Sequence, residues 1–502
     1  MKNFSNAFEL IKNLSMSEKR YFKIFSERHV VGNQNKYTHI FKVLDKQKEE
    51  DDEKLSVKLD KLNVKSDFLA ADKNYLYHLI LRSLLSFHHN KSNTILLTEQ
   101  LFIIEILYEK GLYVLCCKEI EKAKITAEKI ENFTILIELL TWERKAKGYS
   151  KGFEAAYEIN QKIDHYLNLL NNQQEFTNLY FESLKFRNKG FKARELSRIN
   201  EFKILLINKL LRSEDYAQSM LAKIRYHLIF TNFYYVNNDL VNEQKHLEKL
   251  ISLMDNSAYY VSENPFDYIY VNNYLLDIKK HQQEDEFYEL LKKFRAFPQR
   301  LSISKEKANI QVFIFSYLSE FSMLITKHKY RDALELIPIM EEGLIKHKSV
   351  IEPAYQINFY YLFACVKIAT GNFKKALKYI NTIINDYKEE QREDYFIHAH
   401  LLNLIIHFEL EHYELMDYIH GSTLNFYKKR NKLYKTELTV LNFLKQIKDL
   451  QQNRDLKKNY LDLKKELESI KESNFEKVGL DLFNFNLWAD SKIKNCTIAD
   501  LF

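Results

Sequence analysis

Residues 364–383 read ACVKIATGNFKKALKYINTI and place a glycine between two apolar patterns with helical spacing. Gly371 permits the turn conformation, and Phe373 follows two positions later, where an aromatic ring can seal the gap between antiparallel helices. Ala376 is small enough to let the two helices approach closely. The stretch therefore predicts a helical hairpin that turns at Gly371.

The same spacing recurs elsewhere in the chain. Its aromatic position returns at intervals of 40 residues (113 to 153), 43 (330 to 373) and 40 (373 to 413), at Tyr113, Phe153, Tyr330, Phe373 and Tyr413. Only nine glycines and four prolines interrupt 502 residues. We therefore expect helix in at least about 65% of the chain, essentially no strand, and an all-α solenoid of antiparallel helix pairs with a period of about 40 residues.

The hairpin residues 371–376, GNFKKA, resemble the tetratricopeptide repeat, whose core is glycine-x-aromatic-x-x-alanine, and Ala364 matches its small first-helix position. The likeness is fair at Gly111 and Tyr330 and covers about half the chain. It implies a solenoid that holds another molecule. The period of about 40 departs from roughly 34 in that family, so each helix pair is expected to be longer. Residues 14–22 and 483–493 resemble the ends of uncharacterised bacterial proteins of this repeat type, which bring no activity with them.

The pattern divides the chain into three segments. Residues 1–92 are predicted to form a helical N-terminal domain, in which Ser15 and Glu18 have the spacing of a capping box. Residues 93–424 form the repeats, and residues 425–502 form capping helices and an apolar tail. We expect the tail to fold back onto the last helices and shield Trp488, whereas a segment that docks a partner is the alternative. The apolar residues of the tail are Leu480, Leu482, Phe483, Phe485, Leu487 and Trp488.

Composition narrows the class of protein. Lys and Arg number 75 against 68 Asp and Glu, which gives a net charge of +7, too even a balance to indicate nucleic acid by itself. The four cysteines form no C-x-x-C pair, so neither a disulfide framework nor a structural zinc site is indicated. The N-terminus lacks an apolar signal segment, and no stretch reaches about 18 uninterrupted apolar residues. We expect a cytoplasmic protein with no membrane partner.

Catalytic and phosphate-binding motifs are missing from the sequence. No glycine precedes a lysine, so there is no P-loop, and no G-x-G-x-x-G, G-x-S-x-G or H-E-x-x-H occurs. His400 and His407 share a helix face but lie seven residues apart, roughly 10 Å, which is too far for one metal ion. The prediction is therefore a protein that is not an enzyme and has no metal or cofactor.

Two surfaces remain as candidate sites. The first is a concave face suited to a peptide through aromatic and hydrogen-bond contacts, formed by Glu138, Thr141, Lys145, Asn358, Tyr361 and Cys365. Packing between repeats is the other reading of these residues. Positions that carry a charged carboxylate clamp in some tetratricopeptide proteins hold Leu101, Glu105, Thr141, Lys145, Tyr361 and Cys365, so that clamp is not expected.

The second surface is residues 185–212, where nine basic residues accompany Glu195 and Glu201. This local excess could bind phosphates while Phe186 and Phe191 stack on bases; a solvated edge paired with neighbouring acids is the competing interpretation. The basic candidates are Lys185, Arg187, Lys189, Lys192, Arg194 and Arg198. The sequence thus favours a scaffold that binds a protein or peptide, with a nucleic-acid-binding regulator as the alternative.

Overall fold

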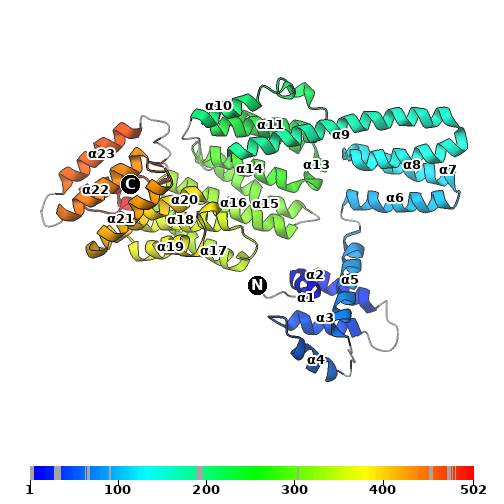
Figure 1. The fold of residues 1–502 in the computed structure, drawn as a ribbon, viewed down its shortest axis with the longest axis horizontal. Helices are drawn as coiled ribbons and strands as arrows, with labels where there is room; N and C mark the ends of the chain where they lie inside the picture. Colours follow the sequence, from blue (N-terminus) through cyan, green and yellow to red (C-terminus); the bar gives the residue numbers. More distant parts are fainter. Residues whose placement is uncertain are drawn as a thin grey trace. The chain divides into compact units, whose positions relative to one another are not determined.

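The computed structural model describes residues 5–27, 36–62, 64, 68–89, 92–187, 196–301, 305–450, 456–471, 476, 479–480 and 482–502. The protein is 85% helix, and the described residues contain no strand (Figure 1). The expectation of an all-helical chain is therefore confirmed. Successive helices pack against their neighbours in the chain, an arrangement consistent with an α-solenoid.

The first helices are α1 (Asn6–Asn13), α2 (Met16–Glu27), α3 (Lys36–Lys46), α4 (Asp52–Asp60), α5 (Leu69–His88), α6 (Asn93–Glu109), α7 (Tyr113–Lys129), α8 (Phe133–Lys151) and α9 (Phe153–Arg187). They are followed by α10 (Leu196–Leu205), η2 (Lys209–Leu211), η3 (Glu214–Tyr216), α11 (Met220–Val236), α12 (Leu240–Asp255), α13 (Ala258–Glu263), α14 (Pro265–Lys279), α15 (Glu284–Ala296) and η4 (Phe297–Arg300). The C-terminal part comprises α16 (Lys305–Thr326), α17 (Tyr330–His347), α18 (Pro353–Ala369), α19 (Phe373–Asp386), η5 (Glu389–Gln391), α20 (Glu393–Glu409), α21 (Tyr413–Lys429), α22 (Lys435–Leu450), α23 (Lys457–Lys471), α25 (Phe485–Lys494) and η6 (Ile498–Leu501).

The chain divides into two compact units. Unit 1 contains residues 1–128 and 135–160, and unit 2 contains residues 129–134 and 161–502. The three segments expected from the sequence, 1–92, 93–424 and 425–502, stay a prediction.

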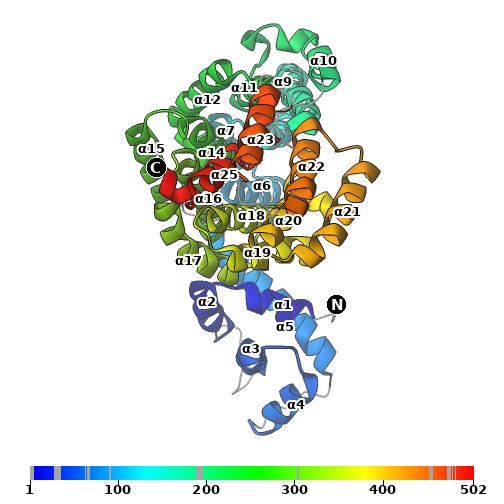
Figure 2. The same cartoon turned by 90° about the vertical axis from the view of Figure 1, so that its left-hand side faces the viewer.

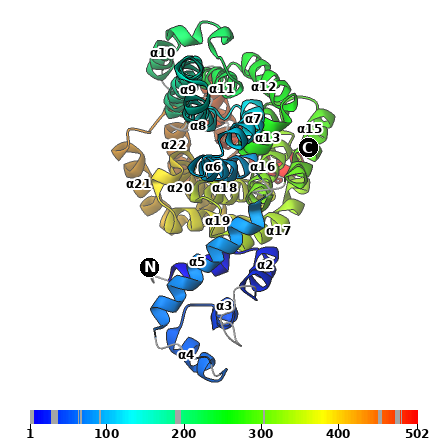
Figure 3. The same ribbon diagram turned by 90° about the vertical axis from the view of Figure 1, so that its right-hand side faces the viewer.

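At the start of unit 1, α5 packs against α1, α2 and α3 (Figure 3). Phe22 and Phe41 meet in the core of these helices with their ring centroids 4.5 Å apart. The capping box is confirmed, because the Ser15 backbone N–H donates to Glu18 Oε2 (2.7 Å) and the Glu18 N–H donates to Ser15 Oγ (3.3 Å). It fixes the start of α2.

Unit 2 is built mainly from helical pairs: α11 with α12, α14 with α15, α16 with α17, α18 with α19 and α20 with α21. From α14 onward, the first helix of each pair packs against the first helix of the next, so α14, α16, α18, α20 and α22 form an inner layer, with the second helices outside it (Figure 2). Helices α18 and α20 are the most apolar of this layer, and 11 residues are buried in each.

Several turns between successive helices contain a residue in the left-handed region. It is Gly111 (φ 72°) and Gly371 (φ 73°) where the sequence placed a turn glycine. At Asn238, His328 and Glu411 a residue with a side chain adopts the same conformation (φ 56°, 59° and 59°). Because these turns do without glycine, a search for the glycine underestimates the number of hairpins.

Packing around the turns agrees with most of the expected roles. Ala376 is fully buried where α18 and α19 meet, and Tyr330 is also buried. Phe153 is 83% exposed, so the expectation that its ring seals a gap between helices is wrong. Gly152, with φ 86°, still makes the turn before it.

Gly343 in α17 tests this packing. A Cβ atom at this position would overlap the ring of Phe313, which lies between Tyr317 and Phe359. Gly343→Ala should therefore destabilise the protein by about 1–3 kcal/mol, although glycine to alanine in a helix ordinarily stabilises by about 1 kcal/mol. Thermal or urea unfolding measures the difference. Gly421→Ala in α21, where a Cβ atom meets nothing within 4 Å, is the matched control and should stabilise; equal effects would contradict the packing.

Candidate peptide-binding face

The residues predicted for peptide binding fall into two groups. Glu138, Thr141 and Lys145 lie on α8 in unit 1. Glu138 and Lys145 are exposed, and Lys145 Nζ lies 4.2 Å from the centroid of the Trp142 ring. Thr141 is half-buried, and its hydroxyl donates to the Ile137 carbonyl (2.8 Å). Asn358, Tyr361 and Cys365 lie on α18 in unit 2.

Tyr361 and Cys365 belong to the core of unit 2 rather than to an open surface. Tyr361 is fully buried and Cys365 is 7% exposed. The Tyr361 ring stacks on Tyr395 at 4.4 Å, and its hydroxyl lies 2.7 Å from His398 Nδ1. The expectation that these two side chains face an open groove is therefore wrong. Peptide binding by the other four residues stays a prediction.

Tyr361 is buried because the C-terminal tail, residues 482–502, covers the inner side of α18 and α20. The Tyr361 hydroxyl also donates to the carbonyl of Leu482 (3.2 Å), and the Phe485 ring packs against His398. Trp488 lies among Phe408, Phe443 and Tyr460, with ring centroids 5.8 to 6.3 Å away. Figure 2 shows α25 surrounded by the inner helices.

Polar contacts fix the tail in this position. Glu409, whose side chain is 3% exposed, accepts a hydrogen bond from Trp488 Nε1 (2.6 Å) and pairs with Lys492. Further along, Asp500 pairs with Arg331 (2.7 Å) and Phe502 stacks on His328 (4.1 Å).

The shielding expected for Trp488 is confirmed, since its side chain is 1% exposed. The expectation that the tail folds back onto the last helices is also confirmed, and the tail extends beyond them. It packs on α22 and α23 at one end and reaches the turn between α16 and α17 at the other.

A surface formed by α11 and part of the inner layer carries five tyrosines, which we name the tyrosine face: Tyr235 on α11, Tyr270 and Tyr274 on α14, Tyr355 on α18 and Tyr395 on α20. Phe315 on α16 contacts two of these tyrosines. Its ring centroid lies 5.4 Å from that of Tyr270 and 5.5 Å from that of Tyr355. Tyr270 is 39% exposed and Tyr355 half-buried. Residues from four helices thus contribute to this face.

On the tyrosine face, groups on neighbouring helices shift the pKa values of the tyrosine hydroxyls. Burial raises the pKa of Tyr355, and neighbouring Tyr270, Tyr274 and Glu352 raise it further against the guanidinium of Arg392. Burial also raises the pKa of Tyr395, which Arg392 opposes from 4.6 Å over the ring. The hydroxyls of Tyr355 and Tyr395 therefore stay protonated near neutral pH and can both donate and accept hydrogen bonds.

Asn358 Oδ1 on α18 and Asp394 Oδ2 on α20 are buried acceptors that lack a donor, as is Asn403 Oδ1 further along α20. The other oxygen of Asp394 accepts from Arg392 Nε (2.9 Å) and from the Tyr395 N–H (2.8 Å). A buried acceptor without a donor costs about 1–3 kcal/mol, so each one needs an explanation. Donors supplied by a bound molecule would satisfy both Asn358 and Asp394.

Among the six basic residues predicted for phosphate binding, the structure describes the side chains of Lys185 and Arg187. Lys185 is exposed at the end of α9. Lys189, Lys192 and Arg194 lie outside the described residues, as does the side chain of Arg198.

Arg187 is 11% exposed, and its guanidinium lies 3.9 Å from the ring centroids of both Tyr235 and Tyr274. Its NH1 is 3.6 Å from Glu243 Oε1 and 3.4 Å from Asn232 Oδ1. The expectation that Arg187 is an exposed phosphate contact is therefore wrong. Its charge instead compensates a buried carboxylate. Glu243 was not identified from the sequence as a partner of Arg187. Glu243 occupies the position in the α11–α12 hairpin that Ala376 occupies in the α18–α19 hairpin. A charged residue at a position that is small in the repeat could have indicated a buried ion pair.

The next features are groups of side chains that could bind a metal ion and helices that could cross a membrane. In the part of the chain that the structure describes, no three His, Cys, Asp or Glu side chains are grouped so that they could hold a metal ion. One stretch there, Glu306–Thr326, is long and apolar enough to cross a membrane, but 67% of its apolar window is buried inside unit 2. That burial is typical of a core helix.

No family model, curated protein or solved structure matches this sequence. The fold and the candidate site are therefore inferred from the sequence and structure of this chain alone. The resemblance to tetratricopeptide repeats stays an expectation.

Arg187 provides a test of the buried contacts. Arg187→Ala removes the stacking on two rings and leaves Glu243 buried without its partner, so the free energy of unfolding should fall by about 3–5 kcal/mol. Chemical denaturation followed by circular dichroism measures the change. Lys185→Ala, at an exposed position two residues earlier, should change stability by less than about 0.5 kcal/mol. If Arg187→Ala were equally neutral, the guanidinium would not hold these helices together.

Proposed function

We propose that the protein is a scaffold of tetratricopeptide-like helical pairs, with a period of about 40 residues, that binds a peptide segment of a protein partner on the tyrosine face. The proposal places it in the cytoplasm and assigns it no catalytic role. The single observation that carries it is the set of tyrosines on the inner helices beside two buried acceptors without donors.

The chemistry of the tyrosine face fits a peptide. Tyrosine and arginine are enriched where proteins bind one another, because a ring gives a large contact area with little loss of side-chain entropy and its hydroxyl hydrogen-bonds. A peptide backbone supplies N–H donors, which Asn358 Oδ1 and Asp394 Oδ2 lack. A helical array also offers such contacts at regular steps along an extended chain.

The tail supports the same assignment by showing what the neighbouring part of the inner layer binds. There a short helix docks with buried aromatic rings, and the hydroxyl of Tyr361 binds a backbone carbonyl of the tail. These are contacts of one chain segment with a helical scaffold. The tyrosine face offers related groups beside it, since Tyr395 stacks on Tyr361.

Binding can be tested with peptides selected from a random display library and measured by calorimetry. Tyr270→Ala should weaken a selected peptide by roughly 30-fold, or about 2 kcal/mol, because truncation removes a ring at the contact. Tyr355→Phe should weaken it less, since only a hydroxyl is lost. Tyr418→Ala, at a 79% exposed position on the outer helix α21, is the control and should bind normally. Equal affinities for all variants, or no selectable peptide, would refute the proposal.

The alternative, a nucleic-acid-binding regulator that uses residues 185–212, stays a prediction with a smaller set of contacts. Arg187 is committed to Glu243 and to two tyrosine rings. Exposed basic residues in the described part of this segment are Lys185, Lys203, Lys209 and Arg212. Phosphate contacts make affinity fall steeply with salt, whereas apolar peptide contacts change little. Titration of DNA and RNA oligonucleotides at several salt concentrations therefore separates the two functions.

A further inference from the structure

Helix α6 in unit 1 is apolar on two opposite sides, but the described residues of unit 1 cover only one of them. Leu97 and Ile104 are fully buried, and the Cys116 thiol lies 3.7 Å from the Ile104 carbonyl. On the other side Phe102, Ile103 and Ile106 are 62%, 48% and 55% exposed. Helices that are apolar all round are ordinarily buried all round.

The turn after α6 enlarges this exposed surface. Leu112, Val114 and Leu115, at the turn and the start of α7, are exposed as well. Contiguous apolar surface of this kind marks an interaction site more often than scattered single residues do. We name the six residues the α6 patch: Phe102, Ile103, Ile106, Leu112, Val114 and Leu115.

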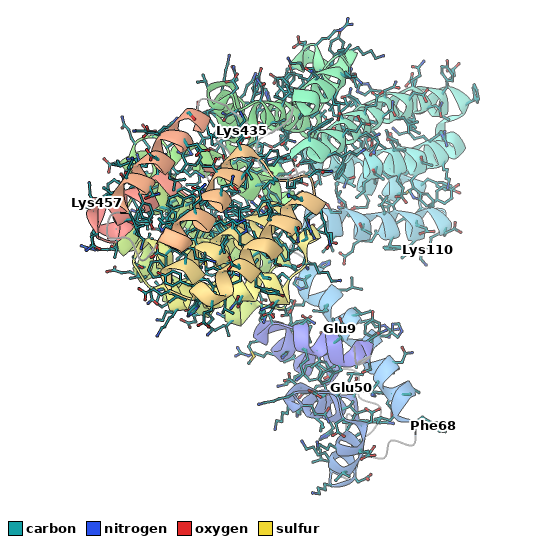
Figure 4. The ribbon with its side chains drawn as sticks, turned by 60° about the vertical axis from the view of Figure 1, so that its left-hand side comes forward. Glu9, Glu50, Phe68, Lys110, Lys435 and Lys457 are labelled. Carbon is teal, nitrogen blue, oxygen red and sulfur yellow. The ribbon has the colours of Figure 1, made fainter. Side chains whose placement is uncertain are left out.

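The charges at the two ends of the α6 patch are complementary to each other. Glu99 begins the uncovered side of α6. Lys110 ends it at the turn into α7 and is labelled in Figure 4. The order along this side is Glu99, Ile103, Ile106, Lys110, with steps of four, three and four residues, which is the spacing of a helix–helix seam. One end is acidic and the other basic, so a second α6 helix that runs antiparallel to the first places its basic end beside the acidic end of the first, and its acidic end beside the basic end.

We propose that the α6 patch binds a second copy of this chain, with the two α6 helices antiparallel about a two-fold axis. In that arrangement Ile103 packs on Ile106 of the second copy, and Glu99 pairs with Lys110 of the second copy. A two-fold contact repeats each pair, so both ends are satisfied at once. Glu99 Oε1 already bonds His89 Nδ1 (2.5 Å), and its second oxygen faces the incoming ammonium.

This arrangement accounts for features that a hetero-partner leaves unexplained. A foreign helix has no reason to require an acid at one end of α6 and a base at the other, whereas an antiparallel copy supplies the opposite charge at both ends. Antiparallel helices also oppose their dipoles favourably. The contact area of one hairpin is modest, so the dimer should be reversible and dependent on concentration.

Light scattering after size-exclusion chromatography, over a range of concentrations, measures this association in the full chain. The wild type should form dimers. Ile103→Glu with Ile106→Glu should raise the dissociation constant on the order of 100-fold, because four isoleucines leave the interface. Ile125→Glu, at a 69% exposed apolar position on α7 outside the α6 patch, should dimerise normally. A wild type that stays monomeric, or a control that dissociates equally, would overturn the proposal.

Charge reversal tests the antiparallel geometry itself. Glu99→Lys and Lys110→Glu should each weaken the dimer, and the double variant should restore it because the pairs are exchanged. A zero-length carbodiimide cross-link between Glu99 and Lys110 gives an independent readout. These residues are 11 apart, roughly 16 Å along one helix, so the cross-link forms only between two copies. Dimers with neither rescue nor this cross-link would exclude the proposed interface.

Neither experiment depends on the tyrosine face, which lies in unit 2. Circular dichroism of each variant confirms that the helices are intact. One further outcome would also overturn the proposal. If the wild type is monomeric and the double variant Ile103→Glu with Ile106→Glu has a lower melting temperature, another part of the same chain covers the α6 patch.

Discussion

Helices α18 and α20 are apolar around their whole circumference, and the need to cover their last side governs the C-terminal half of unit 2. Their paired helices cover one side, and the preceding and following inner helices cover two more. At 11 buried residues each, the fourth side cannot remain in water. The tail supplies that cover with Phe485 and Trp488, and Glu409 fixes it through two charge-assisted or polar contacts.

Covering this side also limits which part of the inner layer stays accessible to solvent. The tail occupies the stretch from Tyr361 to the turn between α16 and α17, while Tyr270 and Tyr355 remain partly exposed. Buried charges on the adjoining helices are compensated within the chain, as Arg187 is by Glu243. What remains on the tyrosine face is therefore a surface of hydroxyls and rings, a chemistry that favours neutral hydrogen bonds over phosphate.

The sequence predicts the helices well because their signal is local. Gly371 and Ala376 mark a hairpin through backbone freedom and small size, and both lie where expected. Asn238 and Glu411 make the same turn with side chains present, so glycine alone does not reveal it. The site is harder to predict, because burial depends on distant segments. Tyr361 reads as a surface residue until Leu482, 121 positions later, binds its hydroxyl. Arg187 reads as a free cation until two rings from α11 and α14 enclose it.

The α6 helix is apolar on all sides like α18, but the described residues of unit 1 leave one of its sides without a cover. Its composition resembles that of α18, with few charges and apolar residues on every side, yet no described segment of unit 1 covers Phe102 and Ile106. In α18 the missing cover comes from the chain's own tail, held by polar contacts at fixed positions. In α6 the equivalent polar groups are Glu99 and Lys110, which are too far apart on one helix to meet each other. An antiparallel copy of α6 brings them together, and the apolar side of the helix is then covered as fully as that of α18.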